Sequence, residues 1–441
     1  MKLSATLLLS VFASLRSAYA GCDFVGGNYY CNEVSGISYQ GIGYSGSYSD
    51  VVSMDESSCK CVQQSASVSG ELAPLDEELS VHFRGPIRLS QFGVYYPSSQ
   101  KKKREVEEEC STQKHYHHKH KRAAAVQTVQ VTATVTVGDG AGQGTTAQQP
   151  ATSAQSQAPA GSSVAYSAAS SAASSAASAP ASSASSGPSS SSVPSTGSWS
   201  RSGYYKPGSV DNLTFLNSLG GKTSSGVWSS CFGNSLSYCA ANGVDASDTP
   251  QALNDVTFKS NTEFVIFSGD ACGESSASGD CGYYREGIPA YHGFGGTSKI
   301  FVFEFTMPSD TGSGAVINDD MPAIWLLNAK IPRTLQYGDS SCSCWSTGCG
   351  ELDLFEILSS GSDKLISHLH SGQGNDGSSR GGGGTQDYIA RPTSSSLKAA
   401  VIFDGGKVDI VVLDDDTTFG SSLDDATLTL WKSKIQSTAS I

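Results

Sequence analysis

The chain has 441 residues, a formal net charge of −13 at pH 7 and twelve cysteines. This acidic balance argues against a nucleic acid partner, because binding to a phosphate backbone requires basic patches. An acidic surface suits a neutral polymer better than a polyanion, so the composition excludes partner classes more than it selects one.

Residues 1–20 are predicted to be a signal peptide. Lys2 provides a positive start, an apolar core follows, and the small-x-small sequence AYA precedes a cleavage site before Gly21. The apolar core is far shorter than the roughly 20 residues of a membrane span, and no later stretch is long and apolar enough to cross a bilayer. We therefore expect a secreted protein, and its cysteines are expected to form disulfides.

The cysteines divide into five before residue 123 and seven after residue 230. Because both counts are odd, either one bridge joins the two regions or each region keeps one free thiol. A zinc site at Cys342, Cys344 and Cys349 is an alternative. The oxidising compartment and the lack of a fourth nearby ligand argue against it. We predict neither a metal nor a cofactor.

Residues 21–100 are predicted to form a small β module stabilised by disulfides. The segment is rich in Gly, Ser and Tyr, and it contains Cys59-Lys-Cys61. Its later part, LSVHFRGPIRLSQFGVYY, alternates apolar and polar residues, which is typical of half-buried strands. The sequence assigns no ligand to this module.

Two segments without a predicted core follow. Residues 101–122 hold basic clusters that end at Arg104 and Arg122, which are either dibasic protease sites or a solvated charge run; the histidines between them indicate an exposed polar segment. Residues 123–197 consist mainly of Ala, Ser, Thr, Pro and Gln, which cannot bury a core. We expect an O-glycosylated, disordered linker that lets two folded units move independently.

Residues 198–441 are predicted to be an all-β domain of two packed antiparallel sheets. Short β-branched or aromatic runs are bounded by Gly, Ser, Asp and Pro, and no long stretch with a helical period competes. The main predicted strands are 263–268, 299–307, 323–328, 351–358, 364–370, 399–403 and 407–413. The sequon at Asn212 predicts N-glycosylation.

One predicted strand carries three acids, in the sequence Glu351-Leu-Asp353-Leu-Phe-Glu356. Side chains at i and i+2 share a face, so Glu351 and Asp353 point the same way. Strict alternation would turn Glu356 toward the core, where an unpaired carboxylate is costly. A β-bulge near Phe355 would return Glu356 to the acidic face.

Three acids on one strand face suit the hydrolysis of a glycosidic bond. A retaining glycosidase needs two carboxyls roughly 5–5.5 Å apart, one as the nucleophile and one as a protonated acid. Crowding of like charges raises the pKa of at least one of them. The alternative is a solvent-facing edge strand, but the apolar neighbours and the lack of a basic partner nearby in sequence favour a site.

The sequence GELDLFE resembles the signature of glycoside hydrolase family sixteen, in the bulged form of laminarinase-type members that act on β-1,3-glucan. The stretches 321–328 and 366–372 resemble its flanking strands, although the cysteine-containing loop before the motif is not general in that family. The whole chain resembles fungal cell-wall proteins with a Gly-rich, Cys-containing amino-terminal domain. The resemblance implies a concanavalin-like jelly roll with Glu351 as nucleophile, Asp353 as its helper and Glu356 as acid/base.

Aromatic and polar residues around the motif are candidates for binding the sugar, because glucan clefts combine aromatic platforms with a few polar groups. Trp325 is expected to wall a subsite and Trp345 to cap the cleft. Core filling by Trp325 and purely structural histidines are the alternatives. The full set of predicted substrate-binding residues is Trp325, Trp345, His368, His370, Tyr284 and Arg285.

These observations predict a secreted, monomeric cell-wall endo-1,3-β-glucanase that retains the anomeric configuration. Its partner would be a β-glucan, with no role for nucleic acid or a membrane. One alternative is a glucan transglycosylase on the same route, and another is a non-catalytic carbohydrate-binding or structural wall protein. The amino-terminal half fits an adhesin on a stalk equally well.

Overall fold

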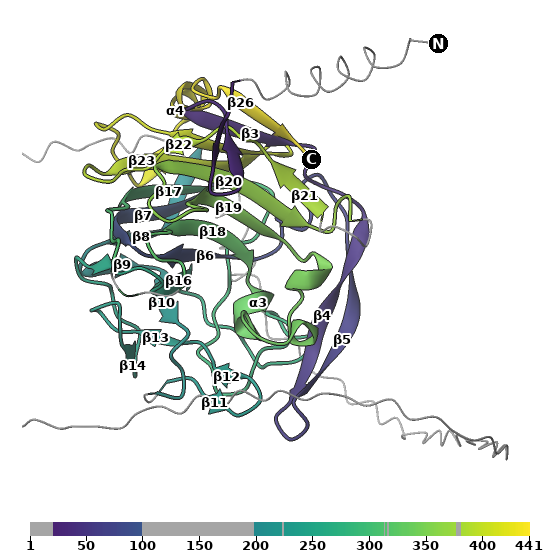
Figure 1. Ribbon diagram of the computed structural model, residues 1–441. Helices are drawn as coiled ribbons and strands as arrows, with labels where there is room; N and C mark the ends of the chain where they lie inside the picture. Colours follow the sequence, from purple (N-terminus) through teal and green to yellow (C-terminus); the bar gives the residue numbers. More distant parts are fainter. Residues whose placement is uncertain (1–20, 99–197, 223–224, 313, 315–316, 376–380) are drawn as a thin grey trace, which may run out of the picture. The chain divides into compact units, whose positions relative to one another are not determined.

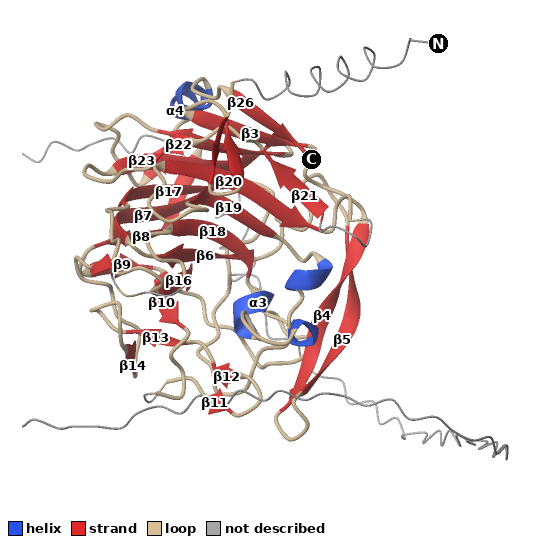
Figure 2. Cartoon of the chain, viewed as in Figure 1, coloured by secondary structure: helices blue, strands red, loops and turns tan. Residues whose placement is uncertain are grey.

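The computed structural model describes residues 21–98, 198–222, 225–312, 314, 317–375 and 381–441. These residues form an all-β sandwich of two ten-stranded sheets, with three two-stranded hairpins and short helices (Figures 1 and 2). The fold class predicted from the sequence is confirmed. Residues 1–20 and 101–197, to which the signal peptide, the basic segment and the linker were assigned, lie outside the described part.

The first sheet, called the front sheet here, has the order β14-β13-β10-β16-β6-β18-β19-β20-β21, with β22 beside β20. In that order its strands are Ala246–Ser247, Ser237–Cys239, Leu213–Asn217, Glu263–Ser268, Leu79–Arg84, Ala323–Asn328, Glu351–Glu356, Lys364–Ser371 and Gly381–Gly384, with β22 at Ile389–Ala390. All of its pairs are antiparallel.

The second sheet, the back sheet, has the order β25-β8-β7-β17-β23-β24-β3-β26, with β15 beside β7 and β9 beside β8. In that order its strands are Ser422–Leu423, Trp199–Lys206, Ile87–Pro97, Lys299–Thr306, Leu397–Asp404, Lys407–Val412, Gly36–Gln40 and Ser437–Ser440, with β15 at Thr257–Phe258 and β9 at Ser209–Asp211. The hairpins are β1–β2 (Asp23–Val25, Asn28–Tyr30), β4–β5 (Gly46–Asp55, Lys60–Val68) and β11–β12 (Trp228–Ser229, Gly233–Asn234).

The main core lies between the two sheets and is rich in phenylalanine. Phe303 of the back sheet lies within 6.3 Å of Phe83 and 6.4 Å of Phe355, both from the front sheet, measured between ring centroids. All three side chains are fully buried. On the outer side of the back sheet, helix α4 (Asp425–Lys432) packs Leu428 and other apolar side chains into a second cluster. The strands therefore bury apolar side chains on their inward faces, as the sequence pattern predicted.

Residues 21–98 do not form a separate module, so that prediction is wrong. Strand β6 pairs with β16 on one side and β18 on the other, and β7 pairs with β17 and β8. Strand β3 lies between β24 and β26. The alternating pattern correctly identified strands, but alternation specifies which side chains share a face and carries no information about neighbouring strands.

The stretch between Ser98 and Ser198, which includes the predicted basic segment and linker, is flanked by neighbouring strands of one sheet. Pro97, at the end of β7, stands opposite Trp199, at the start of β8. The amide of Ser98 also donates to the carbonyl of Ser198 at 2.8 Å. The expectation of two independently moving units is therefore wrong for the described residues, because both sides of the linker belong to the same sandwich.

Disulfides reinforce this union of the two regions. The described residues contain five: Cys22–Cys31, Cys59–Cys231, Cys61–Cys342, Cys272–Cys281 and Cys344–Cys349. Two of them cross between the regions, where at most one was expected. Cys239 is the one described cysteine outside a disulfide, and it is buried. The zinc alternative is excluded because all three of its cysteines are bonded to other cysteines.

No helix in the described ranges is long and apolar enough to cross a membrane. Asn212, the predicted N-glycosylation site, lies in an exposed turn before β10, where its backbone has a positive φ of 47° and its side-chain amide donates to the Ser202 carbonyl at 3.0 Å. Its glycosylation stays a prediction.

Candidate active site

The predicted bulge in the acidic strand is present. The register between β18 and β19 shifts at this point, so that Leu354 and Phe355 both point into the core. The three acids stand opposite alternate residues of β18, in the pairs Glu351–Leu327, Asp353–Trp325 and Glu356–Ala323. Because alternate residues of a strand share a face, all three acidic side chains lie on one face of the front sheet.

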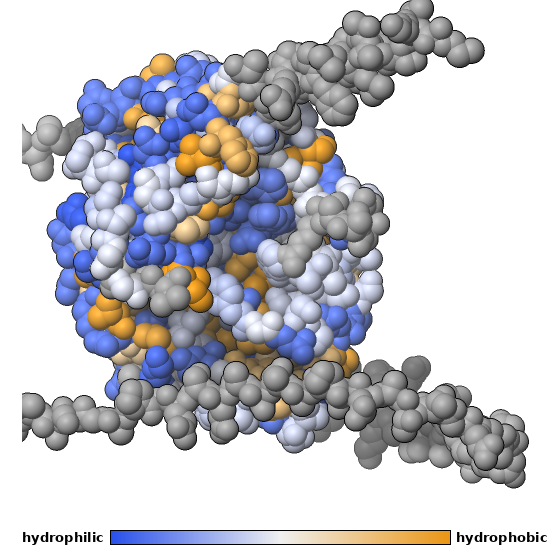
Figure 3. Space-filling model, viewed as in Figure 1, coloured by the Kyte–Doolittle hydropathy of each residue, from blue (hydrophilic) through white to orange (hydrophobic). Residues whose placement is uncertain are grey.

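This acidic face is the outer face of the front sheet. Leu352 and Leu354 point into the core between the sheets. Trp325, which stands opposite Asp353, belongs to a separate cluster on the outer side. Figure 3 shows a hollow on this side of the molecule, between β18 and the short helix α3 (Lys330–Arg333). The Asp353 side chain is only 9 % exposed and that of Glu356 20 % exposed, so water has limited access to the cluster.

Each acid has a polar partner from a different element. The indole Nε1–H of Trp345, in the loop before β19, donates to Glu351 Oε2. His370 Nε2 of β20 lies 3.1 Å from Asp353 Oδ2.

The third acid is paired with an arginine from the amino-terminal segment. Arg84 Nη2 at the end of β6 donates to Glu356 Oε1 at 3.1 Å, and Arg84 Nε donates to the Met321 carbonyl at 2.8 Å. Since each of the three acids has a different fixed partner, their carboxyls are held in defined positions.

Burial and mutual repulsion shift the acids toward their protonated forms. Burial raises the pKa of Glu351 to about 8, and the neighbouring Asp353 carboxylate acts in the same direction, against the Trp345 hydrogen bond. Burial and the charge of Glu356 raise the pKa of Asp353 well above its usual value, against the effect of Arg84. The cluster therefore holds a proton near neutral pH, as an acid catalyst must.

The two histidines lie on the acidic face, as predicted. His370 stands opposite Glu351 and His368 opposite Asp353 on β20, and their rings are 4.7 Å apart. Burial lowers the pKa of His368, and the charge of His370 adds to this effect. His368 is thus held neutral beside the acids, where it can exchange hydrogen bonds without adding a charge.

Trp325 lies beneath the site, where it cannot wall a subsite as predicted. The side chain is on the acidic face but only 5 % exposed. The His82 ring stacks on it at 5.1 Å, and the Arg84 guanidinium lies 5.8 Å from its ring centre. Both covering residues come from β6, a strand that the sequence assigned to another module.

Trp345 lies over the acidic strand in the position predicted for a cap. Its ring centre is 6.3 Å from that of His370, and the two side chains line a small pocket. The loop that carries Trp345 is closed by the Cys344–Cys349 disulfide and tied to the β4–β5 hairpin by Cys61–Cys342. The amino-terminal hairpin thus helps to fix the residue that contacts Glu351.

Tyr284 and Arg285 are not brought to the acids. Arg285 is only 2 % exposed, donates to Ser229 and the Gly233 carbonyl, and holds the β11–β12 hairpin in place. The Tyr284 hydroxyl donates to the Gly273 carbonyl at 2.6 Å, within the loop that the Cys272–Cys281 disulfide closes. Their predicted contact with substrate is therefore not supported, because their polar groups form hydrogen bonds within these loops.

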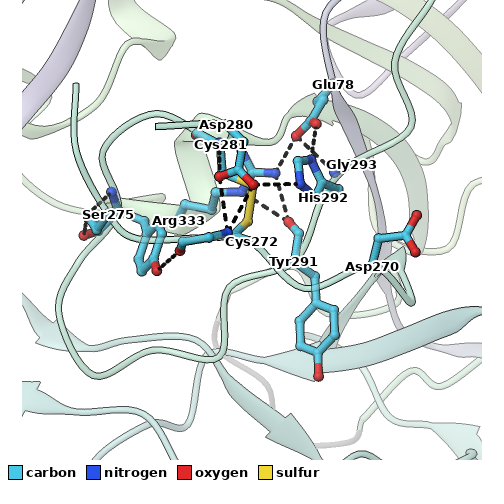
Figure 4. The surroundings of a disulfide bond; sticks show 12 residues. Glu78, Asp270, Cys272, Ser275, Asp280, Cys281, Tyr291, His292, Gly293 and Arg333 are labelled. Atoms are coloured by element: carbon cyan, nitrogen blue, oxygen red, sulfur yellow. Dashed lines mark hydrogen bonds and ion pairs between the residues drawn. A yellow bond between two sulfur atoms is a disulfide. The ribbon is translucent and has the colours of Figure 1, made fainter. Parts of the chain in front are cut away.

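Figure 4 shows the surroundings of that disulfide, where His292 lies between Glu78 and Asp280. His292 Nδ1 is 2.6 Å from Glu78 and Nε2 is 3.3 Å from Asp280, while Arg333 donates to Glu78. His292 and the two cysteine sulfurs lie close enough together to resemble a metal site. The sulfurs are bonded to each other, however, so no thiolate is available as a ligand.

Arg84 and His82 were not among the residues predicted for the site from the sequence. Both belong to the stretch LSVHFR, which ends just before Gly85 and Pro86, and both reach the site because β6 is the direct neighbour of β18. A basic residue at the end of an apolar strand, where a cleft would open, is the signal that could have drawn attention to Arg84.

The fold and site define a β-sandwich protein with a partly buried carboxylate cluster on one sheet face. The chain belongs to the family of cell wall proteins YJL171C/Tos1. Residues 197–431 match the description "Cell wall protein YJL171C/Tos1, C-terminal" and residues 35–97 match the corresponding N-terminal description. The two matched segments are those that interleave in the sandwich.

Curated relatives match over most or all of the chain. A Candida albicans protein named "Probable circularly permuted 1,3-beta-glucanase TOS1" is 54 % identical over 100 % of both chains. A Saccharomyces cerevisiae protein of the same name is 52 % identical, over 100 % of this chain and 99 % of its own. A second Candida albicans protein, named "Probable circularly permuted 1,3-beta-glucanase PGA52", is 33 % identical over 90 % and 82 %. No solved structure matches the chain.

Proposed function

We propose that this cell wall protein is a secreted endo-1,3-β-glucanase that uses Glu351 and Glu356 as its catalytic pair. The observation that carries the proposal is the bulged register of β19, which puts both glutamates and Asp353 on one partly buried face. The names of the full-length relatives indicate the same substrate. They also describe a circular permutation, which agrees with the insertion of amino-terminal β6 beside β18.

The lengths of the acidic side chains suit the distance that the two catalytic carboxyls must bridge. Glu351 and Glu356 stand opposite residues four positions apart on β18, which separates their backbones by roughly 13 Å. A retaining mechanism brings the two carboxyls to roughly 5–5.5 Å. The outer positions carry the longer glutamate and the middle position the shorter aspartate, so the outer side chains can lean toward each other over Asp353.

In the proposed mechanism, a Glu351 carboxylate oxygen attacks the anomeric carbon as the bond to the glycosidic oxygen breaks. Glu356 donates its proton to that leaving oxygen. Glu356 then removes a proton from water, whose oxygen attacks the same carbon and releases Glu351. The Trp345 N–H stabilises the Glu351 carboxylate whenever it is free, and Asp353, hydrogen-bonded to His370, tunes its charge.

These roles require a proton shift when glucan binds. In the free protein the raised pKa values of Glu351 and Asp353 keep a proton on this pair, while Glu356 is paired with Arg84 at 3.1 Å. Catalysis in the proposed direction needs the proton on Glu356.

The test is turnover of laminarin by the purified chain and by its Glu351→Gln and Glu356→Gln variants. Each variant should lose several orders of magnitude in kcat while keeping the thermal transition of the parent protein. On an aryl glucoside with a good leaving group, Glu356→Gln should keep its first step and Glu351→Gln should not. Full activity in both glutamine variants would disprove the site.

Product analysis separates the alternatives. Proton NMR of the first product should show retention of the β configuration, and inversion would contradict the mechanism. Shorter products indicate hydrolysis, while longer oligosaccharides indicate transfer to a sugar hydroxyl. The absence of any turnover of laminarin or of defined oligosaccharides would favour the structural wall protein.

A further inference from the structure

Tyr337 is an exposed aromatic side chain held in one orientation. It is 62 % exposed, yet its hydroxyl donates to the Glu263 carboxylate, with both oxygens at 3.0 Å. An exposed ring that is fixed at its polar end has a free apolar face and little rotational freedom to lose on binding. Such a ring suits stacking against the C–H face of a sugar.

Glu263 connects this tyrosine to the acidic face. It stands opposite Arg84 across β16 and β6, Arg84 stands opposite Ala323, and Ala323 stands opposite Glu356. The four residues form one row across the front sheet. Three strand spacings separate the ends of the row, which is roughly 14 Å. Tyr337 therefore lies beyond the reach of a single sugar unit bound at Glu356.

Tyr337 lines a groove of about 230 Å³. Phe232 and Leu335 provide apolar lining, and Asn234 and Gln336 provide amides. None of the described residues that line the groove carries a charge. An uncharged lining of this kind fits a neutral ligand rich in hydroxyl groups. The volume is below the roughly 300–1,000 Å³ of a pocket for a drug-sized molecule, so it fits a short stretch of chain.

We propose that Tyr337 and this groove form a remote subsite for the glucan chain that is cut at Glu356. The chain would cross β18 and β6 past Arg84 and stack on Tyr337 before it enters the groove. Trp228, which is 61 % exposed, stands opposite the lining residue Asn234 in the β11–β12 hairpin, so a second exposed aromatic residue neighbours the groove. The inference rests on the proposed function, because it takes Glu356 as the point of cleavage.

The test is the length dependence of turnover in the full chain carrying Tyr337→Ala. With long β-1,3-gluco-oligosaccharides, KM should rise about three- to tenfold, as expected for the loss of one stacking contact. The shortest oligosaccharide that is cleaved should give an unchanged KM, and kcat should not change with either substrate. Tyr337→Phe should keep a KM close to that of the parent protein with long oligosaccharides, because the aromatic ring remains.

Phe24→Ala is the matched control, because Phe24 is 61 % exposed but lies in the β1–β2 hairpin. Equal KM values for Tyr337→Ala and the parent protein at every length would overturn the subsite and leave the proposed function intact. An equal loss at every length would also overturn it, since this would show a general effect on the site.

The subsite can also be tested without turnover. If the parent protein cleaves no β-1,3-glucan, the proposed function fails, and calorimetric titration with a long oligosaccharide then decides the subsite. Weaker binding by Tyr337→Ala than by the parent protein would support the subsite. Equal affinities, or no binding by the parent protein, would overturn it.

Discussion

The acidic strand β19 and the cluster of charged residues beside the Cys272–Cys281 disulfide (Figure 4) both gather carboxylates, but their charges are balanced in opposite ways. In this cluster, burial raises the pKa of Glu78, yet Arg333 and the hydrogen bonds from His292 and Gly293 outweigh this and hold it below its usual value. On β19, burial and the Glu356 carboxylate raise the pKa of Asp353, and the charge of Arg84 does not offset them. Carboxylates paired with cations stay ionised and stabilise the fold around them. Carboxyls that outnumber their cations have raised pKa values and can hold a proton for transfer.

The largest effect on stability should come from removing Arg333, the cation that is paired with Glu78. Arg333 is 1 % exposed and also donates to the carbonyls of Tyr291 and Cys281. Arg333→Ala should lower the free energy of unfolding by about 3–5 kcal/mol, because a partly buried Glu78 loses its cation. Urea denaturation at neutral pH measures this loss. The exposed Arg88–Asp255 pair is the control, since Arg88→Ala should cost at most about 1 kcal/mol.

Asp353→Asn should separate activity from stability. The substitution removes one of the crowded charges, so we expect laminarin turnover to fall about a hundredfold while stability at pH 7 does not fall. Asp409→Asn is the matched control. Asp409 is also buried, and burial raises its pKa, but it lies on β24 of the back sheet, where it accepts a hydrogen bond from the Ser38 hydroxyl. Similar losses of activity in both variants would show that the effect is not specific to the site.

A smaller effect is expected from Arg84, the cation contributed by the amino-terminal segment. Arg84→Ala should lower kcat/KM about tenfold and move the acidic limb of the pH–rate profile to higher pH, because the pKa of Asp353 rises further without the positive charge of Arg84. Arg84→Lys should keep the limb near its original position. An unmoved limb in Arg84→Ala would mean that the ion pair has only a structural role.

The last effect concerns the pH dependence of stability. The pKa of Glu351, about 8 in the folded protein, lies above the usual value of 4.5, so the unfolded chain loses this proton first and stability falls as the pH rises from about 4.5 to about 8. Glu351→Gln should weaken this fall. Glu78→Gln should instead weaken the loss of stability in acid, because the folded pKa of Glu78 is lowered. Thermal melts from acidic pH up to about pH 8 measure both slopes, and identical slopes in the two variants would contradict the contrast.

The local features of the site were predictable from the sequence, and the long-range ones were not. The bulge followed from the spacing of Glu351, Asp353 and Glu356, because only a bulge keeps all three out of the core. The covering of Trp325 depends on its neighbour β6, and so does the pairing of Glu356 with Arg84. Strand order is set by contacts between residues more than two hundred positions apart, which no local period encodes.

The contacts of Tyr284 and Arg285 illustrate the same limit. A run of aromatic and charged residues resembles a sugar-binding loop in sequence, but here the Arg285 guanidinium is buried against Phe232 and the β11–β12 hairpin. Burial of this kind depends on the packing of distant segments. Residue type alone therefore could not separate a contact with substrate from a loop anchor.

Because Cys59–Cys231 and Cys61–Cys342 join the stretch before Pro97 to the stretch after Trp199, the intact backbone is not the only covalent connection between them. A protein nicked anywhere between these two residues would run as one species on a non-reducing gel and as two on a reducing gel. Arg84 would stay beside Glu356 in the nicked form, since interleaved strands keep both pieces in place. Maturation by a protease and preservation of the acidic face are therefore compatible.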